Sequence, residues 1–68
     1  MNNLKKIRTA RKLSQFELAK LSNIAPSDIS RIENDKLYCH PGWRERLSEA
    51  LGVSVAELFP EGKKEEVK

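Results

Sequence analysis

Apolar residues recur three or four positions apart along most of the chain, the spacing that places them on one face of a helix. No stretch shows the strict alternation of apolar and polar residues that is typical of a half-buried strand. The pattern predicts five short helices, which cover residues 3–12, 14–22, 26–34, 41–51 and 55–59. We therefore expect a compact all-α fold.

Two of these helices begin with the signature of a capping box, in which a serine and a glutamate three residues later each satisfy a free backbone N–H group. Ser14 and Glu17 have this spacing at the second helix, and Ser54 and Glu57 have it before the fifth. Asn23 follows the second helix, and asparagine tolerates the left-handed backbone conformation that a tight turn requires. We expect the second helix to end in such a turn.

The third and fourth helices each begin with a proline, Pro26 and Pro41. Proline suits the first helical position because it lacks an N–H group and its φ angle is already helical. Ala25 would then be the N-cap of the third helix, although alanine caps poorly. Asp28 can compensate through the helix dipole and by accepting a backbone N–H bond. Gly52 is expected to end the fourth helix.

The length of 68 residues indicates one small domain, which we place at residues 1–60. Residues 61–68, EGKKEEVK, carry charge without an apolar face and are expected to form a disordered tail. No apolar run approaches the roughly 18 residues of a membrane span, and the N-terminus shows no secretory signal. The single cysteine, Cys39, fits a reducing compartment. We expect a cytoplasmic protein that does not enter a membrane.

Positive charge is concentrated in the first half of the chain, although the whole chain carries only +3. Residues 1–36 hold eight Lys or Arg against four acidic residues, whereas residues 37–68 hold five against six. A basic half points to a polyanionic partner, but charged helix faces also keep small proteins soluble. Charge alone leaves both explanations open.

Catalytic chemistry has little support in this sequence. Cys39 and His40 are adjacent but alone, whereas a structural zinc site takes four ligands. The sequence has no second histidine that could act as a base and no glycine-rich phosphate loop. A domain of this size also leaves little room for a deep catalytic cleft. We expect no enzymatic activity, no metal, no cofactor and no small-molecule ligand.

Residues 14–36, SQFELAKLSNIAPSDISRIENDK, resemble the helix-turn-helix unit of the repressor/Cro-type family, also called the lambda-repressor-like or XRE family. Ala19 is small at the point where the two helices of the unit would cross. The apolar positions between these helices are Leu18, Ile24, Ile29 and Ile32. Two short helices joined by a turn of about three to four residues are what the unit requires. The resemblance covers residues 3–59 and implies binding of double-stranded DNA.

In this family the second helix of the unit lies in the major groove, and the first crosses the DNA backbone. The resemblance places Pro26, Ser27 and Arg31 at base edges, with Asp28 beside them. Pro26 can offer only shape and apolar contact, for instance to a thymine methyl group, and Ser27 discriminates little. Asp28 could accept a hydrogen bond from cytosine but would repel a phosphate. Arg31 remains as the strong reader of guanine, unless it clamps a phosphate or pairs with Asp28 instead.

The resemblance also implies contacts to the DNA backbone. Gln15 should meet a phosphate at the start of the first helix of the unit, aided by the N–H groups of that helix N-terminus. Asn34 and Lys36 match positions that contact the backbone just past the second helix of the unit. Arg44 is a weaker phosphate candidate, because the loop before it does not align securely with the family.

Three further residues stand out by comparison with the family. Arg8 and Glu33 match positions that often form an ion pair between the first helix and the end of the second helix of the unit. Such a pair would fix that helix to the rest of the domain, unless both charges are separately solvated. Phe16 lies where the family often has a polar residue, and it could pack either on the loop or on a partner.

We interpret the chain as a DNA-binding transcriptional regulator, a repressor in the simplest case, that binds an operator as a homodimer. Family members commonly dimerise through the last helix and its flanks, where Val55, Leu58 and Phe59 are the candidates. A rival interpretation keeps the helix-turn-helix fold but docks the exposed face at residues 25–31 on another protein, and the donor-poor residues 25–28 favour it. An antirepressor or an antitoxin component would act in this way.

Overall fold

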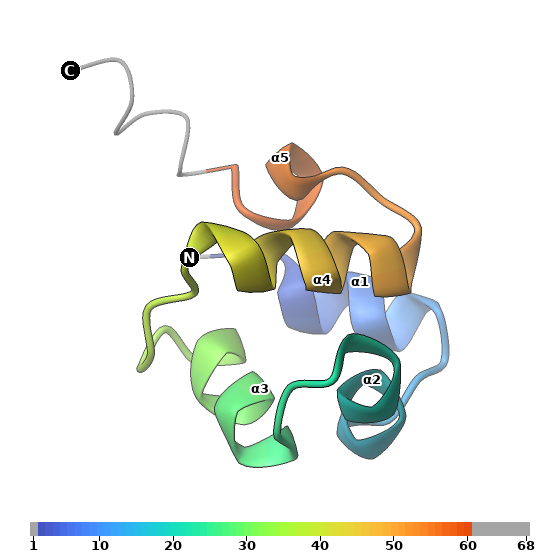
Figure 1. Cartoon of the computed structure of the whole chain (residues 1–68). Coiled ribbons are helices and arrows are strands. Elements are labelled where there is room, and N and C mark those ends of the chain that lie inside the picture. Colours follow the sequence, from blue (N-terminus) through green and yellow to red (C-terminus); the bar gives the residue numbers. More distant parts are fainter. Residues whose placement is uncertain (1, 61–68) are drawn as a thin grey trace, which may run out of the picture.

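Five α-helices build the described part of the computed structural model, residues 2–60 (Figure 1). The helices are α1 (Leu4–Ala10), α2 (Gln15–Ser22), α3 (Pro26–Glu33), α4 (Pro41–Leu51) and α5 (Val55–Leu58). In Figure 1, α4 crosses the middle of the molecule, with α1 behind it, α5 above it, and α2 and α3 below. The predicted all-α fold is confirmed, while the predicted tail at residues 61–68 lies outside the described residues.

Within residues 2–60, no helix combines the length and the apolar character that crossing a membrane would require.

One hydrophobic core lies between the helices. α2 packs against α3 and α4, α3 also packs against α1, and α5 packs against α4. The buried apolar side chains are Leu4, Leu18, Ile24, Ile29, Ile32, Cys39, Leu47, Leu51, Leu58 and Phe59. The apolar positions expected between the two helices of the unit are all among them, which confirms that α2 and α3 pack as a helix-turn-helix.

Two of the three dimer contacts expected at the last helix are buried within the chain. Leu58 is fully buried and Phe59 is only 7% exposed, and Val55 is half-buried against the same core. Leu58 and Phe59 could touch a second copy of the chain only by leaving this core. The apolar face of α5 is thus used mainly within one chain, and dimerisation through this region stays a prediction.

The local signals at α2 and α5 are confirmed. Ser14 Oγ accepts the backbone N–H of Glu17 at 3.0 Å, and the carboxylate of Glu17 accepts the backbone N–H of Ser14 at 2.8 Å. Ser54 and Glu57 form the second capping box in the same way. Asn23 ends α2 with φ 62° and ψ 37°, the left-handed conformation that turns the chain toward α3.

The start of α3 also follows the prediction, with one difference. Pro26 is the first helical residue, and Ala25 before it makes no side-chain cap bond. Asp28 lies in the first turn, where the positive end of the helix dipole favours its charge. Its carboxylate contact is with Arg31, however, rather than with a backbone N–H group.

Three helices end earlier than predicted. α1 stops at Ala10 rather than at residue 12, because Lys12 adopts a left-handed conformation with φ 61°. α3 stops at Glu33, one residue early, and Asp35 beyond it has φ 59°. α5 stops at Leu58, so Phe59 is its C-cap rather than its last turn.

The two ends of the described chain meet. The backbone N–H of Asn3 donates to the carbonyl oxygen of Leu58 at 2.8 Å, and its side-chain amide donates to the carbonyl oxygen of Glu57 at 2.9 Å. Asn3 precedes α1, and Leu58 is the last residue of α5. These bonds attach the start of α1 directly to α5.

Candidate functional site

Arg8 of α1 and Glu33 of α3 form an ion pair that is almost completely buried. Nε of Arg8 lies 2.6 Å from Oε2 of Glu33, and Nη2 lies 3.4 Å from Oε1. The two side chains are only 9% and 2% exposed. Nη1 of Arg8 donates a further bond of 2.6 Å to the carbonyl oxygen of Leu13. The C-terminal end of α3 is thus attached to α1 and to the loop before α2.

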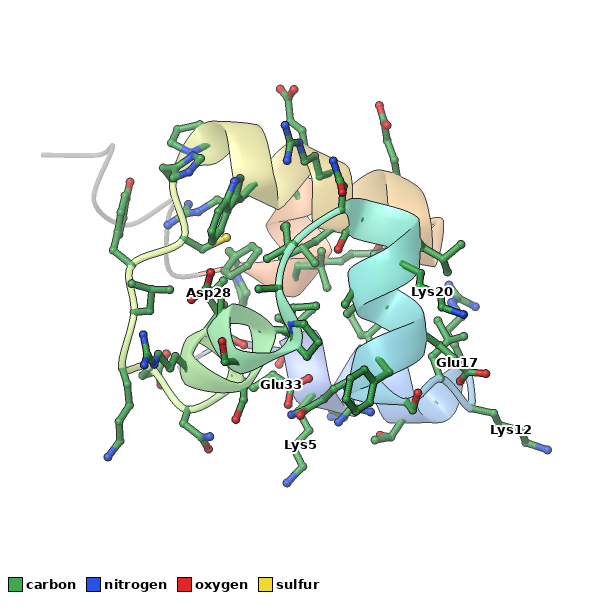
Figure 2. The ribbon with its side chains drawn as sticks, turned by 60° about the horizontal axis from the view of Figure 1, so that its bottom comes forward. Lys5, Lys12, Glu17, Lys20, Asp28 and Glu33 are labelled. Atoms are coloured by element: carbon green, nitrogen blue, oxygen red, sulfur yellow. The ribbon has the colours of Figure 1, made fainter. Side chains whose placement is uncertain are left out.

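Gln15, the first residue of α2, joins this network. Its Nε2 atom donates to Oε1 of Glu33 at 3.0 Å, so Glu33 lies between α3 and the start of α2 (Figure 2). The phosphate contact expected of Gln15 stays a prediction. Its amide group is engaged within the protein here, where it connects the two helices of the helix-turn-helix unit.

Asn2 holds the end of α3 from the other side, a role that sequence reasoning missed. Its side-chain amide donates to the carbonyl oxygen of Ile32 at 2.8 Å and to Oδ1 of Asp35 at 3.1 Å. The side-chain oxygen of Asn2, Oδ1, accepts the backbone N–H of Leu4 at 3.0 Å. Asn2 lies one residue before Asn3, the N-cap of α1, and nothing local indicates that its side chain reaches a carbonyl thirty positions away.

The exposed face of α3 carries Ser27 and Arg31. The side chain of Arg31 is 63% exposed, and its Nη1 atom lies 3.9 Å from Oδ1 of Asp28. An exposed pair of this kind is worth no more than about 1 kcal/mol. A phosphate or a guanine edge could therefore recruit the guanidinium of Arg31 at little cost, while the helix beneath it stays fixed.

Pro26, Asn34 and Lys36 lie at the two ends of this helix. Pro26 is half-buried at its start, whereas Asn34 and Lys36 are exposed beyond its end. Asn34 Nδ2 donates to the carbonyl oxygen of Ser30 at 2.9 Å. The backbone N–H of Lys36 donates to the carbonyl oxygen of Arg31 at 2.8 Å. The backbone at Lys36 is thus held in place, and its ammonium group is free to reach an anion.

Further cations surround the face formed by α2 and α3. Lys5, Lys12 and Lys20 are exposed, and in Figure 2 their side chains extend away from the body of the protein at its edge. Glu17 lies on the same side as Lys12 and Lys20 in this view, and its carboxylate is used in the capping box. The three lysines thus add positive charge at the edge of this face, with Glu17 as an acidic neighbour.

Arg44 has a structural role that weakens it as a phosphate contact. Its Nε atom donates to the carbonyl oxygen of Cys39 at 2.6 Å. Its guanidinium carbon lies 4.8 Å from the ring centroid of Phe59 and 5.4 Å from that of Tyr38, distances typical of cation–π contacts. The side chain is half-buried and fixes the loop between α3 and α4.

Cys39 and His40 do not form a common site. The Cys39 side chain belongs to the core and is only 3% exposed. His40 is exposed, and its ring centroid lies 4.9 Å from that of Trp43, with the two rings tilted by 45°. Burial raises the pKa of the Cys39 thiol to about 11, although the charge of Arg44 acts in the opposite direction. The reactive thiolate form is therefore scarce at neutral pH.

We expect Cys39 to resist alkylation in the folded protein. At pH 8, incubation with iodoacetamide should leave the native chain unmodified, because the thiol is both buried and protonated. The same reagent should modify it rapidly in a denaturant, as measured by mass spectrometry. Rapid modification under native conditions would show that the loop between α3 and α4 opens or that the thiol is activated.

Comparison with known proteins identifies the chain by family. A family model described as a helix-turn-helix domain matches residues 2–59, which is nearly the whole of the described chain. Searches of curated proteins and of solved structures gave no match.

Proposed function

The chain belongs to the helix-turn-helix domain family, and from this premise we propose that it is a sequence-specific transcriptional regulator that binds an operator as a homodimer. In this proposal it acts in the cytoplasm as a repressor, by occupying its operator. The proposal needs no catalytic step, cofactor or small-molecule ligand.

The way in which α3 is held carries this proposal. Its C-terminal end is attached through the buried pair of Glu33 and Arg8, while Ser27 and Arg31 remain exposed on its outer face. A helix held rigidly in its binding conformation loses little conformational entropy when it enters a groove. This arrangement suits a helix that must present the same side chains to base edges in every binding event.

The surrounding residues suit the DNA backbone. The first turn of α2 keeps the N–H groups of Gln15 and Phe16 outside its capping box, where they can meet a phosphate, and Lys36 lies just past α3 with an exposed ammonium group. In a homodimer the two copies of α3 would lie about 34–36 Å apart, which is one turn of DNA. The dimer would have to form through a surface other than the buried face of α5.

Selection of duplexes from a random pool tests the proposal directly. We expect the recovered sites to contain two related half-sites about one helical turn apart. Titration of the best duplex at several salt concentrations should give a log K that falls linearly with log salt, because each neutralised phosphate releases counterions. Absence of binding at low salt by a folded chain would refute the regulator proposal.

Lys36 should contribute to affinity but not to sequence preference. Replacing Lys36 by Ala removes one phosphate contact, so the slope of log K against log salt should decrease by about one for all sequences alike. Lys6→Ala is the matched control, since Lys6 lies in a surface hollow between α1 and α5, away from α3. Equal slopes for Lys36→Ala and the unmodified chain would remove Lys36 from the interface.

A second function, docking on another protein, is favoured by one observation. Phe16 is 72% exposed beside Ala25 and Pro26, which lack side-chain hydrogen-bond donors. A helix-turn-helix used as a protein-interaction module, such as an antirepressor or an antitoxin component, would bury this surface. In that case neither Lys36→Ala nor Arg31→Ala would matter much for DNA binding, and Pro26 and Ser27 would lie in the contact with the protein partner.

A further inference from the structure

A hollow lies on the surface where α2 meets the beginning of α3. The residues that line it are Phe16, Ala19, Lys20, Asn23, Ile24, Ala25 and Pro26. Phe16 is 72% exposed, which makes it the most exposed large apolar side chain in the described part of the protein. The core does not use this ring, which instead lines the hollow together with Ala25 and Pro26.

The walls of the hollow provide almost no hydrogen-bonding groups. Pro26 has no N–H group, and the carbonyl oxygen of Ala25 already accepts the backbone N–H of Ile29 at 3.0 Å. The carbonyl oxygen of Ala19 is likewise occupied, by the backbone N–H of Asn23 at 2.8 Å. The remaining surface is apolar, with the ammonium group of Lys20 and the side-chain amide of Asn23 as its polar side-chain groups. A ligand that fits here must offer an apolar group next to negative charge.

The hollow is continuous with the surface that the proposed function places on DNA. Phe16 is the second residue of α2, and Pro26 is the first residue of α3. The N-terminal turns of both helices are therefore on one side of the hollow, and these turns approach DNA in the proposed binding mode. Lys20 would supply charge for the phosphate backbone beside the contacted base. An apolar protein segment would meet the same walls but would leave this ammonium group without a negative partner.

The major groove carries one apolar group among its donors and acceptors, the 5-methyl group of thymine. We propose that Phe16, together with Ala25 and Pro26, forms a surface that reads thymine methyl groups in the operator, and that this apolar contact provides a share of the sequence preference. The inference rests on the proposed function and goes further, since it assigns specificity to α2 as well as to α3. It gives a role to Phe16, which lies where the family often has a polar residue.

Replacement of thymine by uracil tests whether this surface reads the methyl group, because uracil lacks the methyl group and keeps every hydrogen-bonding group of the base. The probe is the best duplex recovered from a random pool, with each thymine replaced in turn. We expect affinity for the unmodified protein to fall about fourfold for each methyl group that the surface covers. Replacement of thymines outside the selected site should have no effect.

Two variants connect the effect to Phe16. For Phe16→Ala, the ratio of the affinity for the thymine duplex to that for the uracil duplex should fall to about one at the contacted position. The fold should be retained, because the Phe16 ring is exposed. Leu21→Ala is the matched control, because Leu21 is also exposed on α2, at 59%, but lines a different hollow beside α4. Leu21→Ala should keep the full discrimination. Circular dichroism checks that both variants are folded.

The outcomes separate the inference from the function on which it rests. Binding of the selected duplex with no loss at any uracil would overturn the inference and leave the regulator proposal standing. A uracil effect that persists unchanged in Phe16→Ala would overturn the assignment of Phe16. A folded chain that binds no duplex at low salt would overturn both, and would favour a protein as the partner of the hollow.

Discussion

Replacing Glu33 by Ala should destabilise the domain by about 3–5 kcal/mol, because the substitution leaves the guanidinium of Arg8 buried without its carboxylate. The stability of a whole small protein is about 5–15 kcal/mol, so a loss of this size is close to unfolding a chain as short as this one. Urea denaturation followed by circular dichroism measures the change. Gln15 also loses its acceptor in this variant, which adds to the effect.

A double-mutant cycle shows whether the loss belongs to the pair. Arg8→Ala and Glu33→Ala together should cost less than the sum of the single substitutions, with an interaction energy of about 0.5–3 kcal/mol. Arg31→Ala serves as the control, because the exposed pair of Arg31 and Asp28 is worth at most about 1 kcal/mol. Strictly additive losses for Arg8 and Glu33 would mean that the two charges do not interact in solution.

Replacing Arg31 by Ala should cost about 1–3 kcal/mol in binding to the best duplex and relax the preference at one base pair of each half-site. Arg31 is the only residue on the exposed face of α3 that can make a bidentate contact to guanine, because Ser27 discriminates weakly and Pro26 lacks a donor. Binding to the best duplex and to its single-base variants measures both effects.

Arg46→Ala is the matched control for this substitution. Arg46 is exposed on α4, where it lines a hollow with the C-terminal end of α2, so its loss removes the same charge at a distance from α3. Weaker binding without a change in base preference would make Arg31 a phosphate contact. Unchanged binding of Arg31→Ala would remove α3 from the proposed interface.

The parts of the fold that could be predicted depend on local chemistry. The two capping boxes, the proline starts of α3 and α4, and the left-handed Asn23 are each decided by residues within three or four positions of one another. The apolar positions of α2 and α3 follow helical spacing and were placed correctly. Such features can be derived from the sequence because the interacting groups are neighbours in it.

The turns that were missed are not marked by the residue types at which they occur. Lys12 and Asp35 adopt left-handed conformations, although neither is a glycine or an asparagine. Asp35 is held there by bonds from elsewhere, among them one from Asn2. At the end of α1, the backbone N–H of Lys12 donates to the carbonyl oxygen of Thr9, and the backbone N–H of Leu13 donates to the carbonyl oxygen of Arg8, which tightens the turn. No pattern around either residue indicates these contacts.

The candidate site shows the same limit. Arg44 has the residue type of a phosphate contact, but its position between Tyr38 and Phe59 follows from how the loop packs on the core. Leu58 and Phe59 are apolar, and a sequence pattern cannot tell an apolar residue of the core from one of an interface. The exposure of Phe16 likewise became clear only from the structure.

The bonds between Asn3 and the end of α5 make the path of the chain nearly a closed ring. Pro60 and Asn3 line one surface hollow, so the two ends of the described chain lie side by side. A short linker could therefore join them, and new ends could be opened in the exposed loop between α3 and α4 near Lys36. The order of helices would then run α4, α5, α1, α2, α3. The unit of α2 and α3 would remain unbroken in such a permuted chain, with α3 as its last helix.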